Sequence, residues 1–306
     1  MLPNNHLFNY LFLLFKFIKI TILSLKYDYI YALGVNTIYT LIGGIILNKK
    51  IIYHCNEIPS FISKNRSIKK SVDRWLFNKI KYIVVSNKYR RDILKKYSAG
   101  FQKYFILENI LELKYYDYPK NPLVNKSKYD RITLVYSGLI NSNRMILELL
   151  NTIENHPVFD LILVGPISNN NDELIEKINK TKNFSYRGVL PNLEVLNIIK
   201  NECDCGIAFY SMKSLNNKYC APLKIHEYFQ FNKFVITFKN PPLMEIERNY
   251  NIIHTIDSID SLCENTEVNK IRNRLKCLTT NDFMCFLNDS KFLFETEINK
   301  ISDEFS

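Results

Sequence analysis

Residues 218–238 read Lys-Tyr-Cys-Ala-Pro-Leu-Lys-Ile-His-Glu-Tyr-Phe-Gln-Phe-Asn-Lys-Phe-Val-Ile-Thr-Phe, and they predict a short helix followed by a strand. Pro222 suits the first turn of a helix, where its missing N–H costs no hydrogen bond. The predicted helix has a buried side formed by Leu223, Tyr228 and Phe231. The apolar run 234–238 then predicts a short buried strand. A helix that leads directly into a buried strand is typical of an α/β protein.

Lys224 and Glu227 lie three residues apart, so both project from one face of this helix within its first two turns. The start of a helix attracts anions through its free N–H groups and its dipole. A lysine there adds a full positive charge for a phosphate, and a carboxylate one turn later accepts hydrogen bonds from sugar hydroxyls. The pair is a candidate nucleotide-sugar site. The alternative is a solvated Lys–Glu pair, which is common on surface helices.

Length and composition indicate a globular protein with an uneven charge distribution. The 306 residues are 47% hydrophobic, which suits two domains or one large one. The net charge is +11, and residues 61–131 hold 18 Lys and Arg against 6 Asp and Glu. A localised basic region indicates an anionic partner, such as a membrane surface or a phosphorylated substrate. No nucleic-acid-binding motif accompanies the charge, so we expect no nucleic-acid partner.

The cysteines indicate a reduced protein without a structural metal. There are seven, an odd number at irregular spacing. Cys203 and Cys205 are separated by one residue, which is not a zinc-ligand spacing, and no histidine lies near them. We expect free thiols and a cytoplasmic location.

An apolar segment, 7–25, opens the chain but is interrupted by Lys16 and Lys19. Its longest clean run is far shorter than the roughly 20 residues that a membrane span needs. No small-residue cleavage site follows, so we expect no signal peptide. The favoured interpretation is a buried amphipathic helix, and the alternative is contact with a membrane interface.

Helical and strand-like segments alternate on both sides of a proline-containing break. The expected strands are 27–32, 50–54, 82–86, 104–108, 132–136, 159–164, 184–188, 205–209 and 234–238. Such alternation predicts parallel sheets covered on both faces. The expected domains are an N-terminal Rossmann-like acceptor domain, a linker, a C-terminal Rossmann-like nucleotide-sugar domain and a C-terminal helix, at 1–115, 116–131, 132–280 and 281–306.

Several short motifs follow one another in a recognisable order. They are Tyr136-Ser137-Gly138 with a basic residue after it, Leu161–Gly165, Gly188-x-x-Pro191-x-x-Glu194, Asp204-Cys-Gly-Ile-Ala208 and Ala221-Pro-Leu-Lys-Ile-His-Glu-Tyr228. This order resembles the C-terminal half of family-4 retaining glycosyltransferases of the GT-B fold, which occur in bacterial clusters for surface polysaccharides such as capsule and O-antigen. The resemblance covers residues 132–260 well and residues 27–110 more loosely.

The resemblance implies a GT-B architecture, with two Rossmann-like domains facing a cleft. It implies that Glu227 holds the ribose of the donor and that Lys224 and Arg144 lie near the donor phosphates. Gly138 would let the backbone approach the donor, because ligands of open α/β sheets bind beyond the carboxyl ends of the strands. Pro222 and Leu223 belong to the same expected donor site.

The implied reaction moves a sugar from a nucleoside diphosphate sugar to an acceptor hydroxyl with retention of configuration. Its hard part is the charge that develops on the leaving diphosphate, which fixed cations stabilise. No nucleophilic side chain is needed. The sequence has no Asp-x-Asp metal motif, and we expect no metal or other cofactor. His54 and Glu57 are candidates for the acceptor side, with a core position as the alternative for His54.

The chain departs from the family pattern at several positions. Tyr219 replaces a second Glu found in many members, and Leu139 replaces a basic residue after the glycine of the phosphate loop. The usual first strand and glycine-rich turn do not precede the first helix, so we expect a shortened N-terminal domain. These departures keep open an alternative function, a catalytically inactive GT-B-like scaffold or partner subunit at the membrane. A sugar-nucleotide epimerase is a third possibility, disfavoured by the scarcity of suitable His and Glu.

The basic stretch Lys64–Trp75 interleaves cations with Ile68, Val72 and Trp75. On a helix this spacing gives an apolar stripe edged by positive charge, which suits an anionic membrane surface. The alternative is a solvated face of a soluble domain. A membrane contact would fit a lipid-linked or saccharide acceptor and a peripheral position at the inner face of the plasma membrane.

Overall fold

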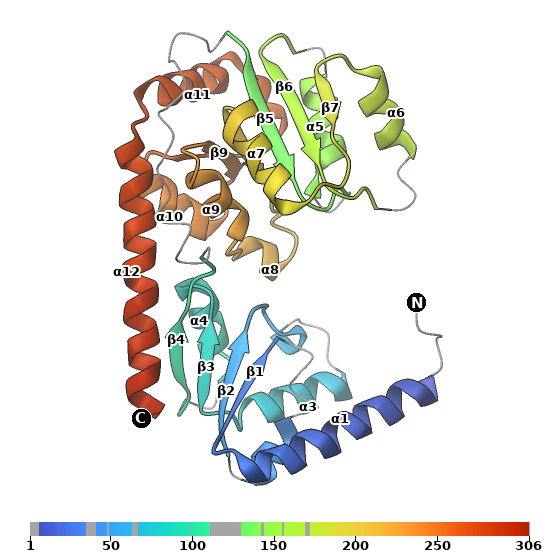
Figure 1. Ribbon diagram of the computed structural model, residues 1–306, viewed down its shortest axis with the longest axis vertical. Helices are drawn as coiled ribbons and strands as arrows, with labels where there is room; N and C mark the ends of the chain where they lie inside the picture. Colours follow the sequence, from blue (N-terminus) through green and yellow to red (C-terminus); the bar gives the residue numbers. More distant parts are fainter. Residues whose placement is uncertain are drawn as a thin grey trace. The chain divides into compact units, whose positions relative to one another are not determined.

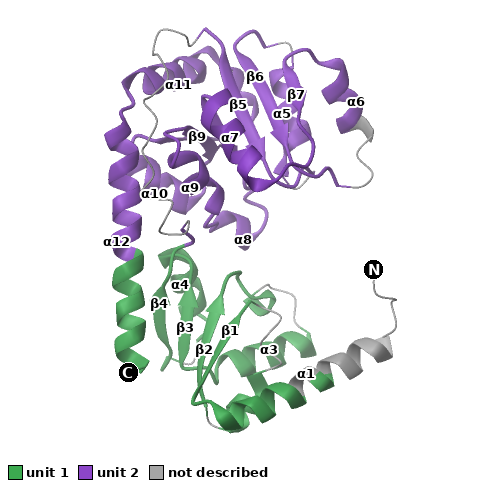
Figure 2. Ribbon diagram, viewed as in Figure 1, with its two compact units in different colours: residues 1–108, 294–306 green, residues 109–293 purple. Residues whose placement is uncertain are grey.

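The structure is a computed structural model of the chain. It describes residues 6–34, 41–47, 49–62, 67–98, 100–110, 130–141, 144–154, 156–168 and 172–305. Most of the expected linker, 116–131, therefore lies outside the described residues. The chain forms two compact units (Figure 2): unit 1 comprises residues 1–108 and 294–306, and unit 2 comprises residues 109–293. The expected C-terminal helix is α12 (Thr280–Phe305), and its residues are divided between the two units.

Unit 1 contains a parallel sheet with the strand order β1-β2-β3-β4 (Figure 1). The strands are β1 (Tyr29–Leu33), β2 (Lys50–Cys55), β3 (Tyr82–Val85) and β4 (Lys103–Ile106), and the helices before and between them are α1 (His6–Lys26), α2 (Ile42–Ile46), α3 (Ile68–Phe77) and α4 (Lys88–Lys95). Because the strands follow chain order, right-handed crossovers place the connecting helices on one face of the sheet.

The other face of this sheet packs against the end of α12. Ile301 and Phe305 contact a buried cluster made of Ile52, Tyr82, Val84 and Phe105. The ring of Phe305 lies edge-on to that of Tyr82, with centroids 4.7 Å apart. The sequence did not indicate that the last turns of the chain complete the core of the first unit.

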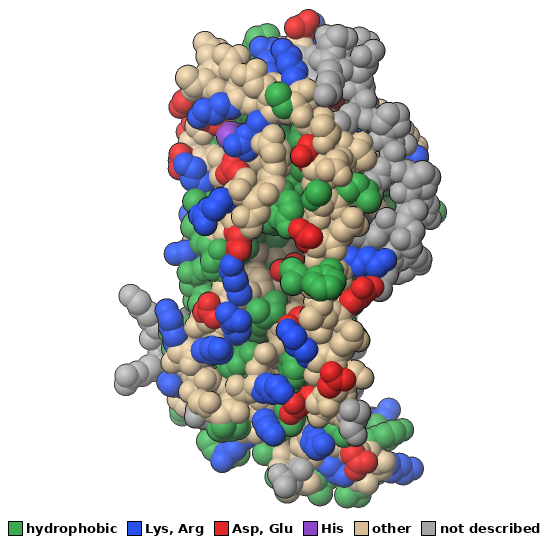
Figure 3. All heavy atoms as spheres, turned by 90° about the vertical axis from the view of Figure 1, so that its left-hand side faces the viewer, with side chains coloured by type: hydrophobic (Ala, Val, Ile, Leu, Met, Phe, Trp, Pro, Cys, Tyr) green, Lys and Arg blue, Asp and Glu red, His purple; other side chains and the backbone are tan. Residues whose placement is uncertain are grey.

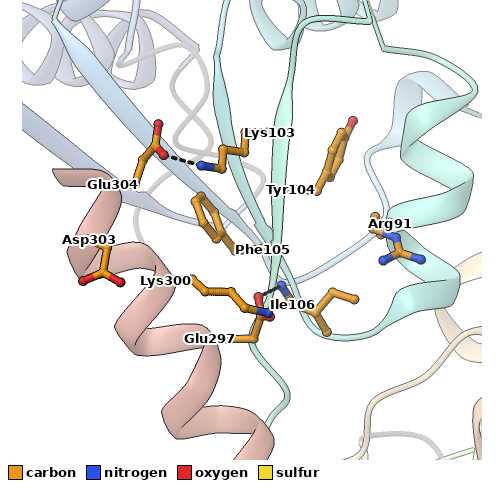
Figure 4. A pocket seen from close by; sticks show the side chains of 9 residues that line it. All are labelled: Arg91, Lys103, Tyr104, Phe105, Ile106, Glu297, Lys300, Asp303 and Glu304. Atoms are coloured by element: carbon orange, nitrogen blue, oxygen red, sulfur yellow. Dashed lines mark hydrogen bonds and ion pairs between the residues drawn. The ribbon is translucent and has the colours of Figure 1, made fainter.

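A groove of about 440 Å³ runs between α12 and the edge strand β4 (Figure 4). The backbone N–H of Ile106 donates to Glu297 Oε2 at 3.0 Å, and Lys103 pairs with Glu304. Glu297 therefore satisfies one backbone donor at the open edge of the sheet. Figure 3 faces this side of the molecule and shows Lys and Arg side chains gathered over unit 1, in agreement with its basic sequence.

Helix α1 does not have the buried apolar side that the sequence predicted. The side that packs against α2 carries Thr21 and Ser24, and a Cβ placed on Gly43 of α2 would lie 2.0 Å from Thr21 Oγ1. Six of the large apolar side chains described in α1 are exposed instead, with Phe15 64% and Leu25 64% accessible. For the described side chains, at residues 14, 15 and 18–26, the expectation of a buried amphipathic helix is thus wrong. No helix in the described part of the chain combines the length and the apolar character needed to cross a membrane.

Unit 2 contains a six-stranded parallel sheet with the order β10-β9-β8-β5-β6-β7. Its strands are β5 (Ile132–Ser137), β6 (Phe159–Val164), β7 (Phe184–Tyr186), β8 (Cys205–Ala208), β9 (Phe234–Phe238) and β10 (Ile253–Ile256). Its helices are α5 (Ile146–Ile153), α6 (Asp172–Lys180), α7 (Asn192–Glu202), α8 (Leu215–Lys218), α9 (Leu223–Phe229), α10 (Pro241–Asn249), α11 (Asn265–Cys277) and the first part of α12.

The direction of strand addition in unit 2 reverses at β5. The chain first builds outward through β6 and β7, then returns to place β8 against the other side of β5. Such a reversal leaves a crevice at the carboxyl ends of the two central strands, where open α/β sheets bind ligands. All seven cysteines are free in the structure.

Candidate functional site

A cavity of about 90 Å³ lies at the carboxyl ends of β5 and β8 in unit 2. It is lined by the ends of both strands and the residues after them, Tyr136, Ser137, Gly138, Leu139, Ile207, Ala208, Phe209 and Tyr210, together with Arg144 and Lys224. The cavity therefore occupies the position that the reversal of strand order marks as a ligand site. It brings together three predicted site residues, Gly138, Arg144 and Lys224.

Lys224 projects from the first turn of α9 and is held by two oxygen atoms. Its Nζ donates to Ser137 Oγ at 3.0 Å and lies 3.0 Å from Glu227 Oε2. The side chain of Lys224 is 25% exposed and that of Glu227 is 16% exposed. The predicted pair is thus an ion pair at the cavity, anchored to the end of a central strand. This contact sets it apart from a solvated pair on a helix surface.

The hydroxyl of Ser137 contacts the phenol of Tyr228, which is fully buried. Tyr228 Oη lies 3.5 Å from Ser137 Oγ and within donating distance of two backbone carbonyls, at 3.3 Å from Ile207 O and 3.4 Å from Val135 O. Burial raises the pKa of Tyr228, so the phenol keeps its proton. Gly206 makes room for this ring, because a Cβ there would lie 2.3 Å from it.

Arg144 lies in a turn before α5 and stacks on an aromatic ring. Its backbone N–H donates to Asn141 Oδ1 at 3.1 Å, and its guanidinium lies 4.9 Å from the ring centroid of Tyr210. Arg144 lies outside the helix, because Met145 has a φ of 55° and α5 begins at Ile146. The left-handed residue ends the turn and separates Arg144 from the helix. A guanidinium on an aromatic face is fixed while its N–H groups remain able to bind an anion.

The loop after β5 packs closely on the loop after β6. Gly138 has a φ of 138° and Gly165 a φ of 130°, and a Cβ on Gly165 would lie 2.1 Å from Gly138 O. Only glycine fits at Gly165, for both its backbone angle and the space available. Tyr136 Oη donates to Leu139 O at 2.9 Å and holds the same loop. The backbone of Gly138 thus lines the cavity without a side chain in front of it.

The remaining predicted donor-site residues lie close to this cavity without lining it. Pro222 precedes α9, and Leu223 at the start of the helix is 41% exposed. Glu227 reaches the site through its contact with Lys224. The cavity lining includes none of these three side chains.

The two predicted acceptor-side residues lie near the carboxyl end of β2 in unit 1, with His54 in the strand and Glu57 two residues after it. His54 Nδ1 is hydrogen-bonded to Tyr31 Oη at 2.6 Å, and its Nε2 is buried with no hydrogen-bond partner among the described residues. Burial lowers the pKa of His54, which favours the neutral imidazole. Glu57 is exposed, as predicted, and Cys55 Sγ donates to its backbone oxygen at 2.9 Å. His54 is therefore neither a fully packed core residue nor a free surface group.

Sequence reasoning missed Ser137, Tyr210 and Tyr228 as parts of the site. The motif Tyr136-Ser137-Gly138 drew attention to its glycine, whereas the hydroxyl before it contacts Lys224. Tyr210 comes shortly after the buried strand β8. Its position beyond the carboxyl end of a strand could have indicated a side chain of the ligand site. In the described ranges, no group of three or more His, Cys, Asp or Glu side chains is arranged to hold a metal ion. The expected absence of a cofactor stays a prediction.

No protein-family model matches this sequence, and a search of curated proteins finds no match. Solved structures do match. HepE from Anabaena in complex with UDP is 15% identical, with a TM-score of 0.67 over 94% of this chain and 82% of HepE. Sucrose-phosphate synthase from Thermosynechococcus elongatus is 12% identical, with a TM-score of 0.63 over 92% of this chain and 73% of that chain.

A third similar structure is the lipopolysaccharide outer core galactosyltransferase WaaB in its apo form. It is 10% identical, with a TM-score of 0.58 over 93% of this chain and 81% of WaaB. These similarities extend over both units and confirm the predicted α/β class and GT-B fold. Since all identities are low, the likeness concerns the fold, and the activity has to be argued from the residues of this chain.

Proposed function

We propose that this chain transfers a sugar from a nucleoside diphosphate sugar to an acceptor hydroxyl. The observation that carries this proposal is the placement of two fixed cations, Lys224 and Arg144, around a cavity at the reversal point of the unit 2 sheet. HepE, with the same fold, was solved with UDP and with UDP and glucose, which favours a uridine nucleotide as the first donor to test.

The chemistry requires stabilisation of negative charge on the departing diphosphate. Lys224 and Arg144 supply positive charge from positions fixed by Ser137 and Tyr210, so little reorganisation is needed as the bond breaks. Glu227 would bind the ribose hydroxyls of the donor. In the structure it neutralises Lys224, and donor binding would exchange this contact for one from the lysine to phosphate.

We include retention of anomeric configuration in the proposal, on the basis of the family resemblance. Such a transfer needs no nucleophilic side chain when the leaving group is stabilised from one side and the acceptor enters from that same side. His54 and Glu57 in unit 1 are proposed for the acceptor side. An NMR assignment of the anomeric configuration of the product against that of the donor tests retention directly.

A lipid-linked or polysaccharide acceptor at the inner face of the plasma membrane completes the proposal. Of the basic stretch, residues 67–75 are described, and α3 exposes Ile68, Val72 and Trp75, with Ile68 87% accessible. Lys79 Nζ lies 5.8 Å from the ring centroid of Trp75. Exposed apolar residues next to cations suit an anionic lipid surface. This arrangement supports a peripheral position, which flotation of the whole chain with anionic vesicles measures.

Isothermal titration calorimetry with UDP and GDP tests the donor site. We expect the chain to bind one of the two nucleotides. The Kd of Glu227→Ala for that nucleotide should be at least about tenfold higher, because hydrogen bonds to a charged group contribute about 1.5–3 kcal/mol. The matched control is Glu194→Ala on the exposed side of α7, which should bind like the original chain.

Absence of binding by any nucleotide would contradict the transferase proposal. That outcome would favour the alternative, a catalytically inactive GT-B-like scaffold or partner subunit at the membrane. Binding without release of UDP from UDP-sugars, with saccharide and lipid-linked acceptors present, would favour a nucleotide-binding subunit over an enzyme.

A further inference from the structure

Helix α1 presents an unusual surface, because small side chains pack against the fold while large apolar side chains beside them are exposed. The side that faces the fold carries small hydroxyl residues: Thr21 packs on Gly43, and Ser24 is 2% exposed, with its Oγ donating to Ile20 O at 2.6 Å. These contacts fix the rotation of the helix about its own axis. Leu25 lies four residues after Thr21 and Leu14 seven residues before it, so large apolar side chains on this same part of the helix surface are nevertheless exposed.

The exposed surface of α1 is largely apolar among the described side chains between residues 14 and 26. Leu14, Ile18, Ile22 and Leu25 follow at intervals of four, four and three residues, which places them in one stripe. Their accessibilities are 54%, 47%, 54% and 64%, and Phe15 at 64% borders the stripe. Single exposed apolar residues are ordinary, but a continuous stripe of this length marks an interaction surface.

The charges on α1 favour an anionic lipid surface over a second copy of the chain as its partner. Lys19 and Lys26 each follow a stripe residue directly and are exposed, and the helix contains no Asp or Glu. A second copy packed through this stripe would bring lysines against lysines with no acidic residue to pair them. A surface with an apolar interior and anionic head groups complements both the stripe and its lysines.

We propose that α1 lies in the plane of an anionic bilayer, with Leu14, Phe15, Ile18, Ile22 and Leu25 among the acyl chains and Lys19 and Lys26 at the head groups. The proposal extends the membrane part of the proposed function to a different element. It does not depend on donor binding by unit 2. It also explains why a helix of this composition packs small polar side chains inward.

The test uses vesicle flotation with the whole chain, without nucleotide. We expect binding to phosphatidylcholine vesicles that contain phosphatidylglycerol and weaker binding to phosphatidylcholine alone. Ile18→Gln/Ile22→Gln should lower the partition coefficient by about tenfold or more, because each buried CH₂ contributes about 0.8 kcal/mol. The control Val189→Gln/Leu193→Gln replaces two aliphatic residues of unit 2 that are 69% and 77% exposed, and it should bind normally.

Lys19→Gln/Lys26→Gln should reduce the preference for anionic vesicles, and added salt should weaken binding of the original chain. Insertion of α1 itself is read from a tryptophan probe. The chain has one tryptophan, so Phe15→Trp in a Trp75→Phe background reports from α1 alone. Its emission should shift to shorter wavelength with vesicles and be quenched by lipids brominated on their acyl chains.

Several results would overturn the proposal. They are an absence of binding to anionic vesicles, equal binding by Ile18→Gln/Ile22→Gln, and an unquenched tryptophan at residue 15. A dimer in solution that dissociates in the double variant would assign the stripe to a second copy instead. Nucleotide titration of the same variants checks unit 2 separately, so failure of the membrane proposal is distinguishable from failure of the transferase proposal.

Discussion

Single residues fix the position of Lys224 at the cavity of unit 2, where we propose that it binds a phosphate of the donor. Its Nζ is held between Ser137 Oγ and Glu227 Oε2, and Ser137 is itself held by Tyr228. A lysine on a flexible stem loses conformational entropy when it binds, and these contacts remove much of that loss in advance. Gly206 has an indirect role, because it admits the Tyr228 ring beneath Ser137.

We therefore expect Ser137→Ala to weaken nucleotide binding by about tenfold while the fold is kept. The reason is the loss of a hydrogen bond from a charged donor, which contributes about 1.5 kcal/mol or more. Calorimetric titration with UDP measures the effect. Ser185→Ala in β7 of the same unit is the control and should leave affinity unchanged. Equal affinity for Ser137→Ala and the original chain would show that Ser137 does not position Lys224.

At the scale of elements, the junction of α10, β10 and α11 depends on one buried histidine between two carboxylates. His254 Nδ1 lies 3.2 Å from Glu247 Oε1 and its Nε2 lies 2.6 Å from Glu267 Oε2. Arg274 Nη1 donates to Glu247 Oε1 at 2.8 Å, and Lys270 pairs with Glu267. Both ring nitrogens and two further cations thus face carboxylates that join the two helices to the edge of the sheet.

This junction predicts acid sensitivity. Burial acts to raise the pKa of Glu247, but hydrogen bonds from His254 and Thr255 and the charge of Arg274 outweigh it and lower the pKa to about 2. The pKa of Glu267 is lowered as well. A carboxyl group whose pKa is lower when folded stabilises the protein above its unfolded pKa, and this contribution disappears as the pH falls through the folded value.

We expect the free energy of unfolding of the original chain to fall more steeply between about pH 4.5 and pH 2 than that of Glu247→Gln. Urea unfolding at a series of pH values measures it. Glu194→Gln, on the exposed side of α7, should keep the original pH dependence. If Glu247→Gln and the original chain lose stability in parallel, the carboxylate of Glu247 does not control this junction.

At the scale of the whole molecule, the division into two compact units and the proposed nucleotide site in unit 2 predict selective stabilisation. The larger core belongs to unit 2, and the smaller cluster around Ile52 and Phe105 belongs to unit 1. A ligand that binds one folded unit stabilises that unit, by about 2.7 kcal/mol at a hundred times its Kd. We expect scanning calorimetry to show two transitions, with UDP shifting only one. Glu227→Ala should reduce this shift, because tenfold weaker binding leaves about 1.4 kcal/mol at the same UDP concentration. An equal shift of both transitions would contradict the prediction.

Local pattern predicted most elements because their hydrophobic runs are short and clearly bounded. The strand at Phe234–Phe238 has its predicted limits. The helix α8 (Leu215–Lys218) was missed, since four residues give no period to recognise. The buried side expected for α1 was wrong because a hydrophobic pattern shows an apolar face but not what covers it. The contact of Ser137 with Lys224 joins residues 87 positions apart, and that of Ile106 with Glu297 of α12 joins residues 191 positions apart. Such contacts follow from topology and have no local signal.

The division of α12 between the units has a consequence for synthesis. Unit 2 is one continuous segment, 109–293, whereas unit 1 needs residues 294–306 in addition to 1–108. On the ribosome, the segment that emerges first is thus the one whose core is completed last. Until Ile301 and Phe305 have left the exit tunnel, one face of the unit 1 sheet stays open to chaperones or to aggregation. The order of folding is therefore the reverse of the order of translation.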